Sequence, residues 1–123
     1  MRTLIVDDDA RFRRFVKGIL SNEPDIVVVG EAADGQEAII KAKELKPDLV
    51  LMDVRMHKLN GLQATRQLKE EMPELKIIIL TLYDFEEYRE AATAAGVVDY
   101  ILKKSINGEL IPAIRKAFES KNT

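Results

Sequence analysis

The chain has 123 residues, of which 46% are hydrophobic, so it is long enough for one compact domain and too short for two. Its 19 basic and 21 acidic residues leave a formal net charge of −2, which excludes a global field that would attract nucleic acid. The absence of cysteine excludes disulfides, thiolate metal sites and cysteine nucleophiles. No apolar run approaches the roughly 20 residues of a membrane span, and the first strand leaves no room for a signal peptide, so we expect a cytoplasmic protein.

The first part of the chain alternates short apolar runs with amphipathic stretches. Residues 3–6 predict a strand, and a helix capped by Asp9 follows, because apolar residues recur there at three- and four-residue spacings. The inward stripe expected for that helix is Phe12, Phe15, Val16, Ile19 and Leu20. Residues 26–29 predict a second strand. Asp34 then begins a capping-box sequence, which predicts a second helix that stops before Pro47.

The middle of the chain contains its most apolar segment. Residues 48–52 predict a third strand that ends at Asp53, and an uninterrupted apolar run of this length is typical of a strand buried on both faces of a parallel sheet. A loop then leads to a helix that begins at Gly61 and is closed by Pro73. Residues 76–80 predict the fourth strand.

The last part predicts one more strand between two helices. Asp84 begins a second capping-box sequence, and Gly96 fits the left-handed residue that follows a helix. Residues 97–102 predict the fifth strand. Pro112 would cost the final helix a hydrogen bond if that helix began as early as Asn107. The residues that this helix is expected to bury are Leu110, Ile114, Ala117 and Phe118.

Strands that alternate with helices through short connections predict an α/β fold with a doubly wound, five-stranded parallel sheet and five helices. Of the two common doubly wound orders, the flavodoxin-like strand order 2-1-3-4-5 suits a five-stranded chain. This order makes the first and third strands neighbours and brings Asp7, Asp8 and Asp53 to one edge of the sheet. Thr81 and Lys103 follow the next two strands at the same edge. In open parallel sheets this edge carries the ligand crevice.

The expected chemistry follows from the charges at this edge. Three carboxylates repel one another, and Lys103 alone cannot balance them, so we expect raised acid pKa values or a bound cation. Because only oxygen ligands are available and His57 is the sole histidine, the expected ion is hard, namely Mg²⁺ or alternatively Mn²⁺. Such an ion polarises a phosphoryl group, which a carboxylate such as that of Asp53 accepts as an acyl phosphate.

The ordered set of motifs resembles the receiver domain of bacterial two-component response regulators over essentially the whole chain. The matching fragments are Val6-Asp7-Asp8, Asp53 followed by Met56 and Gly61, Thr81 after an isoleucine-rich strand, and Tyr100-Ile101-Leu102-Lys103. Further details resemble the receivers of LuxR-type helix-turn-helix transcription factors related to the nitrate regulator. These details are Gly30-Glu31-Ala32, Asp34-Gly35 and Thr81-Leu82-Tyr83-Asp84.

The resemblance implies a role for each acidic residue of the predicted site. Asp53 would be the phosphoacceptor. Asp8 and Asp53 would bind Mg²⁺ directly, with the backbone carbonyl of Arg55 as a third ligand. Asp7 would act on the metal mainly through water. The domain would then span residues 1–123, either as a stand-alone protein or as a fragment of a longer regulator.

The resemblance also implies a conformational switch. Lys103 would pair with one phosphoryl oxygen, and Thr81 would hydrogen-bond another. The added charge would pull Thr81 inward and let Tyr100 rotate into the space this frees, which repacks the fourth helix, fifth strand and fifth helix. The implied partner is a histidine kinase, with a homodimer on phosphorylation left open. Neither a membrane partner nor direct nucleic-acid binding is expected, because control of transcription would pass through a separate output domain.

Several departures and alternatives stay open at this level. Lys104 replaces a proline common after the lysine, so the Lys103–Lys104 peptide could be cis or trans. Arg55 and Tyr83 stand where receivers influence the water molecule that attacks the acyl phosphate, which predicts slow self-hydrolysis.

A phosphorelay intermediate is a second interpretation of the same domain. An aspartyl-phosphate phosphatase is an alternative from the class of enzymes, but it would need a second acid at the position of Arg55. A flavin carrier would need a phosphate-binding loop after the first strand, where this chain has three aspartates. We therefore expect a switch rather than an enzyme, one that promotes only its own phosphorylation and dephosphorylation.

Overall fold

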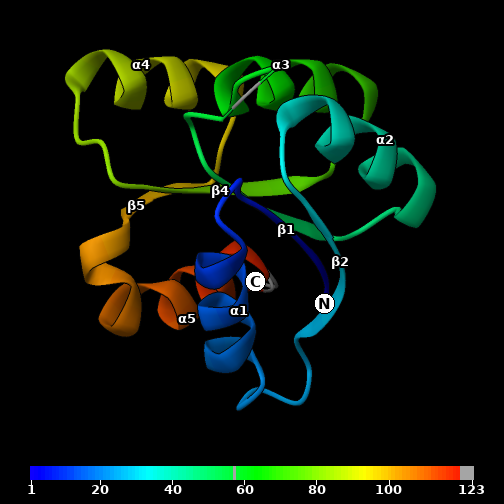
Figure 1. Ribbon diagram of the computed structural model, residues 1–123, viewed down its shortest axis with the longest axis vertical. Helices are drawn as coiled ribbons and strands as arrows, with labels where there is room; N and C mark the ends of the chain where they lie inside the picture. The colour runs from blue at the N-terminus through cyan, green and yellow to red at the C-terminus, as the bar shows by residue number, and fades with distance from the viewer. Residues whose placement is uncertain (57, 120–123) are drawn as a thin grey trace.

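The computed structural model describes residues 1–56 and 58–119 and places a parallel sheet between two layers of helices (Figure 1). The strands are β1 (Arg2–Val6), β2 (Val27–Ala32), β3 (Leu49–Met52), β4 (Lys76–Thr81) and β5 (Asp99–Leu102). The helices are α1 (Ala10–Leu20), α2 (Gly35–Leu45), α3 (Gly61–Glu71), α4 (Glu86–Ala95) and α5 (Ile106–Ala117), and a short 3-10 helix, η1 (Lys103–Ser105), precedes α5. Helices α1 and α5 cover one face of the sheet, and α2, α3 and α4 cover the other (Figure 1).

The strand order is β2-β1-β3-β4-β5 with all neighbours parallel, which confirms the predicted flavodoxin-like topology. Val6 pairs with Met52, so the residues that follow them reach the same edge together. The hydrogen-bond ladder continues past the strand ends, because the amide of Asp53 donates to the carbonyl of Val6 and that of Asp7 donates to the carbonyl of Ala32. The backbone on which the acidic side chains stand is therefore held by the sheet itself.

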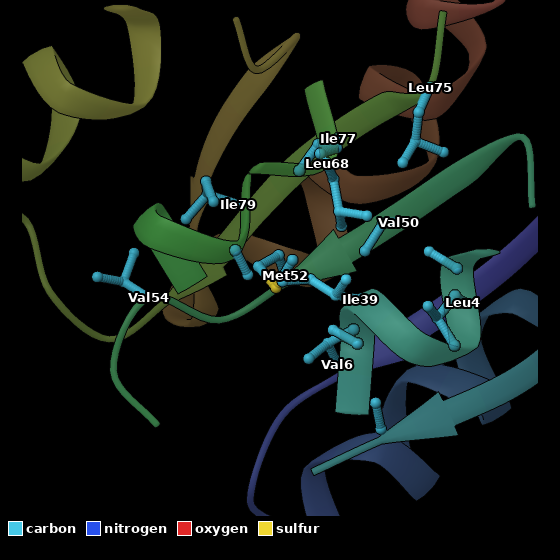
Figure 2. Packing of buried hydrophobic residues seen from close by; sticks show 14 of the residues in the cluster. Leu4, Val6, Ile39, Val50, Met52, Val54, Leu68, Leu75, Ile77 and Ile79 are labelled. Carbon is cyan, nitrogen blue, oxygen red and sulfur yellow. The ribbon is translucent and has the colours of Figure 1, made fainter. Parts of the chain in front are cut away.

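Each face of the sheet buries its own hydrophobic cluster. All four residues of β3 are buried, as the prediction from its uninterrupted apolar run required. Val50 and Met52 face the cluster under α2 and α3, where Figure 2 shows them beside Ile39 and Leu68. Leu49 and Leu51 contribute to the opposite cluster, under α1 and α5.

Two strand boundaries differ from the prediction by more than one residue. Strand β2 continues through Gly30 and Glu31 to Ala32, three residues beyond the expected end. Strand β5 begins at Asp99 instead of residue 97, because the chain is still closing α4 there: Gly96 has a left-handed φ of 95°, and the amide of Val97 donates to a carbonyl of that helix.

Two expectations about helices are wrong. Asp84 does not cap α4; the N-cap residue is Phe85, and no side chain caps the helix there. The Asp84 carboxylate instead accepts a hydrogen bond from Arg89 Nε at 2.6 Å. Phe15 is not part of the inward stripe of α1, since it is 48% exposed.

The final helix behaves largely as expected. It begins at Ile106 and contains Pro112, so the lost backbone hydrogen bond applies. Leu110 and Ile114 are fully buried, whereas Ala117 and Phe118 are only partly buried where the helix ends. In the described part of the chain, no helix has the length and apolar character needed to cross a membrane.

Candidate functional site

Three aspartates meet at the carboxyl edge of the sheet. Asp7 and Asp8 follow β1, Asp53 follows β3, and one carboxylate oxygen from each lies within 4.8 Å of the others. Asp7 and Asp53 are only 2% and 6% exposed, whereas Asp8 is exposed. The structure thus brings together the acids that the strand order predicts, with one of them open to solvent.

Both the carboxylate and the backbone carbonyl of Asp7 are held by neighbouring groups. The amide of Asp9 donates to Asp7 Oδ1 at 2.9 Å, and the Arg13 guanidinium donates to the Asp7 backbone carbonyl. Lys103 Nζ lies 2.7 Å from Asp7 Oδ2, an ion-pair distance. The contact with the ammonium is an ion pair that lacks hydrogen-bond geometry. Asp7 Oδ2 is therefore a buried oxygen without a hydrogen-bond partner among the described residues. Such an oxygen retains a free lone pair for a cation or an ordered water.

Asp53 combines burial with partial neutralisation. Burial is the main cause that raises the pKa of Asp53 to about 6, and the charge of Asp7 adds to the rise. The Lys103 ammonium, 3.6 Å from Asp53 Oδ2, opposes the rise, as do the nearby Thr81 hydroxyl and a hydrogen bond from the Val54 amide, which donates at 2.8 Å. At neutral pH the carboxylate is therefore mostly ionised, although its surroundings disfavour the charged form.

Lys103 reaches the site from the end of β5, where η1 begins. Its side chain is 12% exposed, and its Nζ lies 4.1 Å from the ring centroid of Phe12 on α1. The peptide between Lys103 and Lys104 is trans, as are all peptides of the described residues. Sequence reasoning assigned Phe12 only to the core stripe of α1. No sequence signal indicates that its ring lies beside this lysine.

Thr81 and Tyr100 are joined through Tyr83. Thr81 is fully buried at the end of β4, and its Oγ1 accepts a hydrogen bond from the Tyr83 amide at 3.3 Å. The Tyr100 hydroxyl donates to the Tyr83 carbonyl at 2.6 Å. Burial raises the pKa of that hydroxyl, so it stays protonated and able to donate at neutral pH. The Arg89 guanidinium lies 4.6 Å from the Tyr100 ring centroid.

The loop after Asp53 is held by a glycine at the start of α3. A Cβ at Gly61 would lie 1.8 Å from the carbonyl oxygen of Asp53, so only glycine allows this approach. The Gly61 amide also donates to the carbonyl of Val54 at 2.8 Å. Arg55 is exposed in this loop, with its guanidinium 5.0 Å from the ring centroid of Tyr83. His57 lies outside the described residues.

The donor set fits a hard divalent cation. The three carboxylates supply only oxygen, two of them are buried, and one buried oxygen accepts no hydrogen bond from any residue that the structure describes. Oxygen-only ligands select Mg²⁺ or a similar ion, and the chain contains no cysteine that would favour a softer metal. A cation here would also relieve the repulsion between the carboxylates.

Comparison with known proteins gives one consistent result. The family model described as "Response regulator receiver domain" matches residues 3–115. The response regulator protein VraR of Staphylococcus epidermidis is 42% identical over 124 residues, which cover 99% of this chain and 58% of that protein. The chain thus spans somewhat more than half the length of this curated relative.

Solved structures agree with the sequence match. The response regulator domain of Thermotoga maritima CheB superposes with a TM-score of 0.90 at 34% identity, covering 99% of this chain and 98% of that one. The receiver domain of a putative NarL regulator from Mycobacterium tuberculosis gives a TM-score of 0.89 at 28% identity, covering 97% of each chain. The chain belongs to the response regulator receiver domain family, and its similarity is to receivers of the VraR and NarL kind.

Proposed function

We propose that this receiver domain is a switch in which Asp53 accepts a phosphoryl group from a histidine kinase. Receiver domains act as phosphoacceptors, pair with histidine kinases and bind Mg²⁺ at an acidic pocket. The observation that carries the proposal is the placement of a buried, partly neutralised Asp53 beside Asp7, Asp8 and Lys103 at one edge of the sheet.

The proposed metal is Mg²⁺, with Mn²⁺ as a substitute. Asp8 and Asp53 would bind it directly, the backbone carbonyl of Arg55 would be a third ligand, and Asp7 would act through water. The burial of Asp7 and the free lone pair on its Oδ2 support a cation close by. When bound, such an ion withdraws electron density from the phosphoryl oxygens.

The chain's own residues supply the nucleophile and the compensating charge. An ionised oxygen of Asp53 attacks phosphorus, the bond from phosphorus to the donor's leaving group breaks, and that group departs with the electron pair. Lys103 lies close enough to Asp53 to pair with a phosphoryl oxygen attached there. The hydroxyl of Thr81, whose proximity lowers the pKa of Asp53, would bond a second oxygen.

The proposed signal leaves the site through Tyr83. If Thr81 turns toward a phosphoryl oxygen, its hydrogen bond from the Tyr83 amide is lost. The Tyr83 carbonyl is the group that holds the Tyr100 hydroxyl, so the same movement releases or redirects Tyr100. A change at Asp53 would thereby reach β5 and the first turn of α4.

The proposed output is control of transcription in the cytoplasm, through a separate output domain. Support comes from the VraR relatives, which are longer than this chain, since it covers 58% of one of them. Residues 1–123 would then form one receiver domain of a longer regulator, with dimer formation on phosphorylation as a further step. A stand-alone receiver or phosphorelay intermediate is the second candidate, because the site chemistry is the same in each.

The test is phosphorylation by a small phosphodonor with Mg²⁺, followed by intact mass. Wild type is expected to gain one phosphoryl group, and Asp53→Asn is expected to gain none. Glu74→Gln is the matched control, because Glu74 is an exposed acid outside the site. Chelation of Mg²⁺ should abolish the gain. Equal labelling of wild type and Asp53→Asn would refute the proposal.

A further inference from the structure

The aromatic ring of Phe12, on α1, contacts the lysine of the candidate site. The residue is half-buried and packs against the hydrophobic cluster under α1 and α5. Its ring centroid lies 4.1 Å from Lys103 Nζ, so the charged end of the lysine, and not only its stem, lies over the ring. A cation at this distance is attracted by the negative face of the ring.

The ammonium of Lys103 is held from three directions. Asp7 Oδ2 lies 2.7 Å from Nζ, Asp53 Oδ2 lies 3.6 Å away, and the Phe12 ring contributes the third contact. The side chain is only 12% exposed, so the ring and the acids together leave little of it to solvent. The ammonium also stands closer to Asp7 than to Asp53, the residue proposed to be phosphorylated.

We propose that Phe12 is a positioning residue for phosphoryl transfer, which acts by holding the Lys103 ammonium beside Asp53. A divalent cation bound by the carboxylates would compete for their charge and repel the ammonium, but it would not remove the attraction of a neutral ring. Lysine is flexible and strongly hydrated, so without the ring the ammonium would turn toward solvent. This inference rests on the proposed function of Asp53.

The chain offers a matched set of variants. Phe12→Tyr keeps the aromatic face, and Phe12→Leu keeps the apolar packing without it. Phe15→Leu is the control, because Phe15 is an exposed aromatic on the same helix, with its ring centroid 6.2 Å from that of Phe12. Thermal unfolding of each variant shows that it is folded before its rate is compared.

The first experiment is a time course of Asp53 labelling by a small phosphodonor with Mg²⁺. We expect Phe12→Leu to label about fivefold more slowly than wild type, and Phe12→Tyr and Phe15→Leu to label within about twofold of it. In a Lys103→Ala background, Phe12→Leu should cause no further loss, because the ring acts through the lysine. An equal loss in both backgrounds would show a purely structural role and overturn the inference.

A second experiment reads the contact without any reaction. In wild type and Phe12→Tyr, the ε-methylene protons of Lys103 are expected to show an upfield ring-current shift that persists when Mg²⁺ is added. Loss of the shift on adding Mg²⁺ would overturn the inference. If wild type labels at Asp53 and Phe12→Leu labels equally fast, only the role of Phe12 fails. If wild type does not label at all, the proposed function fails and this role fails with it.

Discussion

The Tyr100 hydroxyl donates a hydrogen bond to the backbone carbonyl of Tyr83, 2.6 Å away. This bond joins β5 to the segment between β4 and α4, next to the point where the Tyr83 amide bonds Thr81. One residue, Tyr83, therefore meets the buried end of β4 through its amide and the half-buried aromatic of β5 through its carbonyl.

Tyr100→Phe removes the hydroxyl and keeps the ring. We expect the free energy of unfolding, measured with urea, to fall by about 1 kcal/mol, because a partly buried hydrogen bond is lost. Labelling of Asp53 should persist, while the change that phosphorylation causes in the amide NMR shifts of α4 should shrink. Tyr88→Phe is the control, since no hydrogen bond of its hydroxyl occurs among the described residues. Equal effects of the two variants on the α4 shifts would contradict the prediction.

The raised pKa of Asp53 predicts a pH-dependent stability. Because this pKa is about 6 in the folded protein and 3.8 ordinarily, the folded state binds the proton more tightly than the unfolded chain. Ionised Asp53 therefore destabilises the fold above about pH 6, and this penalty is lost as the pH falls from about 6 toward 4.

Asp53→Asn removes that penalty. Without metal, we expect the variant to be more stable than wild type at pH 8 by up to about 3 kcal/mol, with the difference shrinking below pH 6. Urea unfolding at several pH values in EDTA measures this. Asp48→Asn is the control, as Asp48 is exposed at the opposite end of β3. A difference that stays constant from pH 8 to pH 4 would mean that burial does not raise the Asp53 pKa.

Mg²⁺ should stabilise the folded protein. A ligand that binds only the folded state at about ten times its Kd adds about 1.4 kcal/mol. We expect Mg²⁺ to raise the melting temperature of wild type and to have little effect on Asp8→Asn or Asp53→Asn, because each loses a proposed ligand. Glu74→Gln should respond like wild type. An undiminished Mg²⁺ effect in both aspartate variants would place the ion elsewhere.

Gly61→Ala tests the packing of the loop behind the site. The new Cβ would meet the Asp53 carbonyl oxygen at 1.8 Å, so the backbone at Asp53 must shift. We expect a loss of about 2 kcal/mol or more in the free energy of unfolding, together with a loss of Asp53 labelling.

Gly18→Ala is the matched control for that substitution. Gly18 lies within α1, and apart from its chain neighbours and the backbone of that helix no described atom lies within 4 Å of a new Cβ, so alanine there should stabilise the helix by about 0.5–1 kcal/mol. Equal free energies of unfolding for the two glycine variants would show that the close approach at Gly61 does not limit stability.

The grouping of Asp7, Asp8 and Asp53 was predictable because it depends only on hydrophobic runs and strand order. Apolar strands of the right length end at these residues, and the topology makes β1 and β3 neighbours. The packing of individual side chains is not needed for this prediction. Hydrophobic runs and strand order therefore place the backbone of the site but not the contacts of its side chains.

What sequence patterns missed depends on contacts between distant segments. The capping-box spacing at Asp84 failed because Arg89 takes its carboxylate. Strand β2 runs on through Glu31, a polar residue that ends many strands, because Arg13 and Lys17 both pair with its carboxylate at the edge of the sheet. Phe12 reads as core from its spacing, and only the turn at η1 brings a lysine over its ring.

The contact between Arg55 and Tyr83 predicts slow loss of the phosphoryl group from Asp53. The Arg55 guanidinium lies 5.0 Å from the Tyr83 ring centroid, and the two residues stand in the loops that follow β3 and β4, the strands that lead to Asp53 and Thr81. Together they would hinder a water molecule that attacks the acyl phosphate in line. We therefore expect the double variant Arg55→Ala, Tyr83→Ala to lose its label several-fold faster than wild type, measured by intact mass after the phosphodonor is removed. Lys58→Ala is the control, since Lys58 is an exposed base of the same loop that pairs with Asp34 instead. An unchanged lifetime in the double variant would show that these side chains do not limit access of water.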